Sequence, residues 1–180
     1  MKRLLLSLAI SGIFAFSTVS AQTKESAWHG QQLSFGFDAA APVGDFSDFH
    51  KFGLGLSVQF QTPIAKNLNF TASVGYLNFT GKEYLRTGYL IIKENNLSAV
   101  PVKVGVRYFI SDKFYAGAEL GAAFGTSDNA GTMAVYSPNI GFQLPLANKK
   151  AIDLGLRYEG WANNGSSAFV GLRAAYNFGI

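Results

Sequence analysis

The first candidates for chemistry in this 180-residue sequence are its two histidines, because acyl transfer needs a base beside a nucleophile. His29 lies in a short polar stretch near the N-terminus, and His50 follows a segment rich in Gly and Asp. His50 could act on Ser47 or Ser57, with Asp48 orienting its ring. The residues around His50 match no acyltransferase or deacylase motif. We therefore interpret His50 as a solvated loop histidine and expect no catalytic residue.

A second candidate is a pair of carboxylates acting as general acid and base, for which Glu119 with Glu159 or Asp153 could serve. Each of these acids lies on the polar face of a segment whose polarity alternates along the chain. The same faces carry equal numbers of acidic and basic residues, namely Asp38, Lys103, Arg107, Glu119, Asp153, Arg157, Glu159 and Arg173. Because buried charges persist only when they are paired and hydrogen-bonded, we predict a structural salt-bridge network.

The sequence contains no motif for binding metals, phosphate groups or nucleic acids. Asp45 and Asp48 could help to hold a hard cation, but Asp beside Gly is typical of a turn, and no cysteine is present for a thiolate site. Without Lys2 and Arg3, the 15 basic residues become 13 against 11 acidic ones, a net charge of +2. We expect no metal, no cofactor and no nucleic-acid partner.

Residues 1–21 have the features of a secretory signal peptide. A positive start is followed by an apolar run that ends at Phe16 and by the small residues Val19-Ser20-Ala21. A membrane-anchoring helix is disfavoured, because the run is short and no basic flank follows it. We expect residues 22–31 to be a polar periplasmic lead-in and residues 32–180 to form one domain.

The C-terminal stretch from Phe169 to Ile180 alternates between apolar and mixed residues, which predicts a strand with one apolar face. Seven earlier segments repeat this pattern, at about residues 32–40, 52–61, 68–77, 97–110, 114–124, 132–144 and 151–160. Segments of about ten residues can cross a bilayer as tilted strands. Pro138 interrupts one of them, where we expect a bulge or a missing hydrogen bond.

If the N-terminus lies in the periplasm, aromatic residues on the apolar faces fall into two bands near the two rims. The residues of these predicted girdles are Phe60, Phe70, Tyr108, Phe114, Phe142, Tyr158, Trp161, Tyr176 and Phe178. Mainly aliphatic or small residues lie between the bands, which is typical of a barrel in a bilayer. The sequence therefore predicts an all-β fold, an eight-stranded antiparallel up-and-down transmembrane barrel with a lumen filled by side chains.

The segment Pro42-Val43-Gly44-Asp45-Phe46-Ser47, followed by Gly53-Leu54-Gly55-Leu56-Ser57, resembles the first loop and second strand of small outer-membrane β-barrels. This family includes the OmpA transmembrane domain and OmpX-like proteins. The resemblance implies a monomer in the cell outer membrane, surrounded by membrane lipid and lipopolysaccharide and inserted by the barrel-assembly machinery. Proteins of this family usually have an aromatic residue in the last position. Here the last residue is Ile180, and Phe178 lies two positions before it.

The longest irregular stretch, at about residues 78–96, is the best candidate for an interaction with a partner. It is more apolar than a solvated loop requires, and its candidate interaction residues are Lys82, Tyr84, Arg86, Tyr89, Ile91 and Lys93. One hypothesis is that the flanking strands continue as a hairpin that offers an edge or an apolar patch to a surface protein. The alternative is a loop that packs on the barrel rim or touches lipopolysaccharide.

We therefore expect a non-enzymatic protein with a structural or surface-interaction role. Two other functions stay open. Some eight-stranded barrels are lipid A-modifying enzymes, a palmitoyltransferase and a deacylase. A narrow pore or small-ligand carrier, with its charged residues along a wet channel, is the other alternative.

Overall fold

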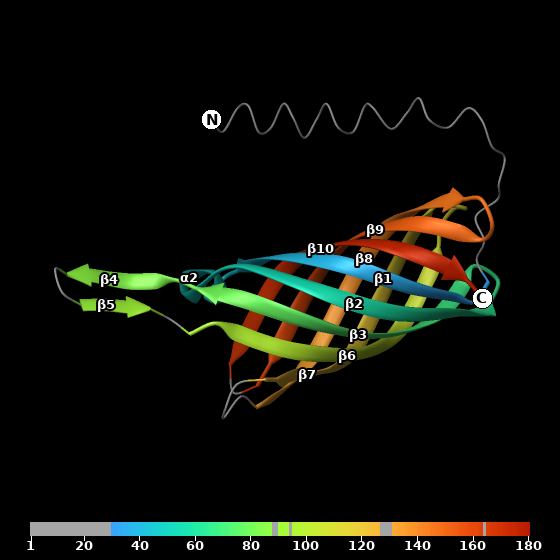
Figure 1. Cartoon of the computed structure of the whole chain (residues 1–180). Coiled ribbons are helices and arrows are strands. Elements are labelled where there is room, and N and C mark those ends of the chain that lie inside the picture. The colour runs from blue at the N-terminus through green and yellow to red at the C-terminus, as the bar shows by residue number, and fades with distance from the viewer. Residues whose placement is uncertain (1–29, 88–89, 94, 127–130, 164) are drawn as a thin grey trace.

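The computed structural model describes residues 30–87, 90–93, 95–126, 131–163 and 165–180. Among them, eight long strands close into one antiparallel barrel (Figure 1). The strands are β1 (Gln32–Val43), β2 (His50–Ala65), β3 (Leu68–Gly81), β6 (Leu97–Phe109), β7 (Phe114–Gly125), β8 (Thr132–Leu146), β9 (Lys150–Ala162) and β10 (Ser166–Gly179). The predicted signal peptide, and all but the last two residues of the lead-in, lie outside the described residues.

The last strand closes the barrel, because β10 pairs with β9 over residues 166–178 on one side and with β1 over residues 168–179 on the other. The pairing with β1 runs in one register from Gln32 opposite Gly179 to Val43 opposite Ala168. Both edges of the terminal strand are therefore satisfied, as an aggregation-resistant β-protein requires. The predicted eight-stranded barrel is confirmed.

Pro138 interrupts the sheet without shifting it. It lies opposite Ala118 of β7, in a pairing that has no irregularity. On the other side, the pairing of β8 with β9 passes from Tyr136 opposite Gly160 to Asn139 opposite Arg157 in an unchanged register. We expected either a bulge or a missing hydrogen bond at Pro138. The register is unshifted, so there is no bulge, and residues 137 and 138 are not paired with β9. Proline has no N–H group to donate to a neighbouring strand.

The two faces of the barrel wall have opposite character. Outward-facing Phe37, Leu120 and Leu172 are 74%, 65% and 61% exposed, whereas inward-facing Asp153 and Glu159 are fully buried. This distribution is the reverse of that in a water-soluble protein, where charged residues are rarely buried. No helix among the described residues is long and apolar enough to span a membrane.

All the predicted girdle residues except one face outward. The prediction for Trp161 was wrong, since this side chain is 1% exposed and points into the barrel. The reason is the length of β9, which continues to Ala162 instead of ending near residue 160. The alternation of faces continues with it, so that Tyr158 faces outward while Glu159 and Trp161 face inward.

A short helix and a two-stranded sheet extend the barrel at the end opposite the C-terminus, which we call the outer end. A short helix, α2 (Phe46–Phe49), follows β1. The strands β4 (Glu83–Thr87) and β5 (Leu90–Lys93) form a separate two-stranded sheet that projects beyond the barrel (Figure 1). Of the two alternatives that the sequence left open, the structure has the hairpin, but as a sheet of its own and not as an unbroken continuation of the flanking strands. The strand β3 reaches four residues further than predicted, to Gly81.

Candidate functional site

The middle of the lumen holds a cluster of buried charges. The Lys103 Nζ atom lies 2.6 Å from Oε2 of Glu159 and 3.5 Å from Oε2 of Glu119. The Arg157 Nε atom lies 2.9 Å from the same Glu159 oxygen, and its Nη1 atom donates to Asp38. The other Glu119 oxygen accepts hydrogen bonds from Gln59, Thr71 and Ser73. These contacts join strands on opposite sides of the lumen, so the charges hold the barrel together from inside.

A second group of contacts surrounds Asp153, nearer the end where the C-terminus lies. Its Oδ2 atom lies 2.7 Å from Arg107 Nη1 and accepts a 3.0 Å hydrogen bond from Gln143. The Tyr115 hydroxyl donates to Oδ1 over 2.8 Å, and the Arg107 guanidinium lies 3.8 Å from the centre of the Tyr115 ring. Both oxygens of this fully buried carboxylate are therefore satisfied.

Arg173 joins the network through a serine. Its Nε atom donates to the Ser57 hydroxyl over 2.8 Å, and that hydroxyl donates to Asp38 over 2.6 Å. Room for the guanidinium comes from Gly36, where an added Cβ would lie 2.8 Å from Arg173 Nε. Of the eight charged residues singled out in the sequence, the structure places Arg173 in this bridged position and the others in direct ion pairs.

This arrangement leaves little room for a substrate. The cavity that remains among the charged side chains has a volume of about 50 Å³, enough for only a few water molecules. Glu119, Glu159 and Asp153 each form an ion pair with a lysine or arginine side chain. Among the described residues, no three or more His, Cys, Asp or Glu side chains are grouped so that they could hold a metal ion. The geometry therefore supports a structural role for the carboxylates.

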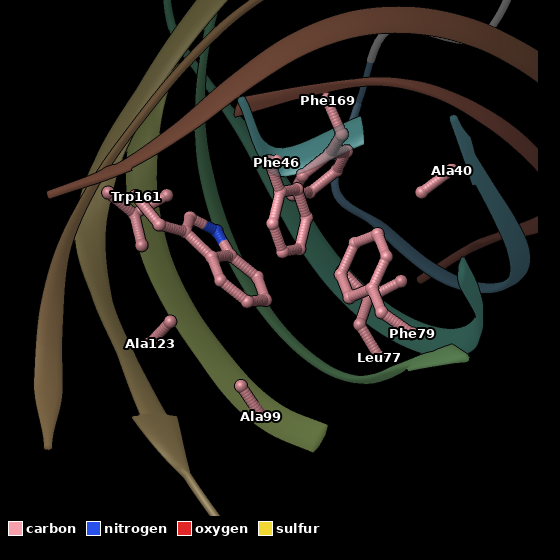
Figure 2. Close-up of a cluster of buried hydrophobic side chains, with 9 residues drawn as sticks. Ala40, Phe46, Leu77, Phe79, Ala99, Ala123, Trp161 and Phe169 are labelled. Carbon is pink, nitrogen blue, oxygen red and sulfur yellow. The ribbon is translucent and has the colours of Figure 1, made fainter. Parts of the chain in front are cut away.

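An aromatic cluster that the sequence analysis missed fills the outer end of the lumen (Figure 2). The Phe79 ring lies 5.7 Å from Trp161, 5.1 Å from Phe169 and 5.0 Å from Phe46, between ring centroids. Phe46 comes from α2, so the first outer loop contributes to the cluster. The Trp161 Nε1 atom donates to Glu159 over 2.8 Å and links the cluster to the charges below.

His50 is buried, contrary to the solvated position expected for it. Its side chain is 8% exposed, and its ring centroid lies 4.6 Å from that of Phe46. It is the first residue of β2 and faces inward there. The candidate nucleophiles are otherwise engaged, since the Ser47 hydroxyl donates to the Gly44 carbonyl and the Ser57 hydroxyl donates to Asp38.

Of the six candidate interaction residues, the five that the structure describes lie on or beside the projecting hairpin. Lys82 precedes β4, and its Nζ atom donates to the carbonyl of Ser47 in α2. The backbone of the hairpin pairs Arg86 with Ile91 and Glu83 with Lys93. Tyr84 belongs to β4, whereas Tyr89 lies outside the described residues.

Known structures share this architecture at low sequence identity. The attachment invasion locus protein Ail of Yersinia pestis is 15% identical with a TM-score of 0.56, over 84% of this chain and 100% of that one. The chain has the fold of a small outer-membrane β-barrel. The outer-membrane protein OprG of Pseudomonas aeruginosa has a similar structure, at 11% identity and a TM-score of 0.55. The outer-membrane protein AlkL is also similar, at 12% identity and a TM-score of 0.50. The match with OprG covers 86% of this chain and 99% of OprG. The match with AlkL covers 89% of this chain and 95% of AlkL. No protein-family model and no curated protein matches the chain.

The fold gives the outward apolar surface a physical role, because a transmembrane barrel presents its apolar band to lipid and its polar residues to the lumen. Aliphatic side chains such as Leu56 and Val104 are exposed in the middle of the wall, and aromatic side chains such as Tyr108 and Phe124 are exposed near its ends. The resemblance to small outer-membrane barrels stated from the sequence is confirmed at the level of the fold.

Proposed function

We propose that the protein is a non-enzymatic outer-membrane barrel that presents the β4–β5 hairpin to a protein partner at the cell surface. The observation that carries this proposal is the separate two-stranded sheet beyond the barrel wall (Figure 1). The lumen is filled by the ion-pair network and the aromatic cluster. A filled lumen favours action through the outer surface over transport through the barrel.

The backbone of the hairpin supports recognition by strand addition. Within the part of the chain that the structure describes, β4 and β5 pair only with each other, so each has one unpaired edge. An unpaired strand edge is a template for an extended segment of another chain, and backbone hydrogen bonds supply much of the affinity. An isolated two-stranded hairpin is only marginally stable in water, so a third strand from a partner would stabilise it.

To reach the outer membrane, the chain must be exported across the inner membrane and then inserted. Residues 1–21 would direct the chain across the inner membrane as a cleaved signal peptide, and residues 22–31 would remain in the periplasm. The barrel-assembly machinery would then insert residues 32–180 as a monomer, with lipopolysaccharide around its outer end. The apolar outward face of the strands supports this location.

A photo-crosslinking amino acid at position 85 in intact cells tests the proposed contact. We expect a protein adduct from position 85 and none from position 112, which lies in a turn at the opposite end of the barrel. Ile91→Pro removes a backbone N–H from β5 and should abolish the adduct. Ile91→Val keeps the strand and should retain it.

Both variants must migrate as folded barrels on unheated gels, so that loss of the adduct reports the hairpin alone. Adducts that are equally strong in Ile91→Pro and Ile91→Val would contradict strand addition. The absence of any adduct from position 85, in cells where the barrel is folded, would contradict the surface-interaction role itself.

A further inference from the structure

The outer mouth of the barrel contains an open pocket beside the aromatic cluster. Its volume is about 390 Å³, and its walls come from α2 and from the outer ends of β6, β8, β9 and β10. We call it the outer pocket and define it by Asp45, Phe46, Phe49, Leu97, Met133 and Trp161. Pockets of about 300–1,000 Å³ are typical of small-molecule sites. The lining of this one also includes the polar residues His50, Asn163, Ser166 and Ser167.

The floor of the outer pocket is apolar and held in place. Phe46 and Trp161 are 5% and 1% exposed and belong to the cluster around Phe79. Leu97 and Met133 are partly buried and pack against the same cluster. A ligand with an apolar body would meet this floor without rearranging it, which lowers the entropic cost of binding.

The rim of the outer pocket combines an aromatic ring with a carboxylate. Phe49 is 46% exposed although it is a large apolar residue. Asp45 lies at the N-cap position of α2, but its side chain makes no capping hydrogen bond there. None of the ion pairs found among the described residues includes Asp45. Its carboxylate is therefore available to a ligand.

We propose that the outer pocket binds a small organic cation, an amine or quaternary ammonium group on an apolar ring or short chain. The apolar body packs on Phe46, Leu97 and Met133, and the cationic group lies between the Asp45 carboxylate and the Phe49 ring. Aromatic faces attract such cations through their quadrupole, and a carboxylate adds charge attraction. An anionic ligand of the same shape is repelled by Asp45. This site adds a small-molecule function to the proposed surface interaction and does not depend on it.

Tryptophan fluorescence of the full chain in zwitterionic lipid nanodiscs tests the proposal. The chain has two tryptophans, and Trp28→Phe leaves Trp161 in the pocket as the reporter. We expect phenethyltrimethylammonium to change the Trp161 emission saturably. The neutral isostere, in which carbon replaces nitrogen, and the anion 3-phenylpropanoate should each bind at least about threefold more weakly, as expected for loss of an exposed charge contact.

Two matched variants locate the charge. Asp45→Asn should weaken binding of the cation about fivefold, the upper range for an exposed ion pair, and leave the neutral isostere unaffected. Asp48→Asn removes the same charge from the same helix, outside the outer pocket, and should leave the affinity unchanged. Phe49→Ala should weaken binding of the cation by about twofold to tenfold through loss of the cation–π contact.

Three results would overturn the proposal. They are a cation that produces no saturable change, a neutral isostere that binds as tightly as the cation, and equal weakening by Asp45→Asn and Asp48→Asn. The last result would show general attraction to a negative surface. Gel mobility without heating verifies that each variant is folded, so that weakened binding reports the pocket.

Discussion

Replacing Asp153 with alanine is expected to lower the free energy of unfolding of the barrel by about 3–5 kcal/mol, the usual cost of leaving a buried charge without its partner. Asp153 is fully buried and accepts hydrogen bonds from Arg107, Tyr115 and Gln143. Its removal leaves the Arg107 guanidinium buried without its carboxylate. Urea titration in phospholipid vesicles, followed by tryptophan fluorescence, measures the effect.

Two controls separate this loss from a general effect of the substitution. Asp112→Ala removes an exposed carboxylate at the same end of the barrel and should change the unfolding free energy by less than about 0.5 kcal/mol. Asp153→Leu combined with Arg107→Met removes both charges and should recover most of the stability. A single Asp153→Ala variant as stable as Asp112→Ala would contradict the structural role of the ion pairs.

Replacing Phe79 with alanine is expected to cost about 3–5 kcal/mol of unfolding free energy, because it opens a cavity in the aromatic cluster. Phe79 has no exposed surface and contacts the rings of Phe46, Trp161 and Phe169. The same urea titration measures the loss. The spectrum of Trp161 should also shift, since its ring would lose a neighbour.

Phe124→Ala provides the comparison for Phe79→Ala, since Phe124 lies at the outer end of β7 but faces outward and is 47% exposed. We expect a clearly smaller loss of stability from Phe124→Ala, because lipid can fill the space that the ring leaves. Equal losses from the two variants would show that the cluster contributes no more to stability than an outward-facing ring does.

The strands were predictable because the outward face of each strand is apolar along most of its length, while the inward face is mixed. The alternation in residues 169–180 therefore indicates both the strand and its apolar face, and the observed β10 agrees. The ends of strands were less predictable. The outer extensions of β3 to Gly81 and of β9 to Ala162 are stabilised by pairing with neighbouring strands, which the local sequence does not encode.

The charged set was predictable as a group but not as pairs. Lys103 and Arg107 of β6 contact Glu159 and Asp153 of β9 across the lumen, although these strands are not neighbours in the barrel. Which side chains meet depends on the stagger of all eight strands. The pairing therefore requires the three-dimensional structure.

The aromatic cluster was missed because its members come from faces interpreted as polar. Phe79 follows the predicted end of its strand, and Phe169 is a large residue among small and charged ones. Extending the alternation of β3 and β9 outward by a few residues would have placed Phe79 and Trp161 inside the barrel. The burial of His50 beside Phe46 depends on the fold of the first outer loop, for which its sequence gives no periodic pattern.

Gel mobility of the washed outer-membrane fraction before and after boiling tests whether the strands form a barrel whose outward faces contact lipid. A barrel that resists detergent predicts an unheated band at a different apparent size, which moves to the position of the unfolded chain on boiling. A protein released in soluble form into the periplasm, with a mobility that boiling does not change, would contradict contact between the barrel and lipid. Its apolar faces would then have to pack against each other.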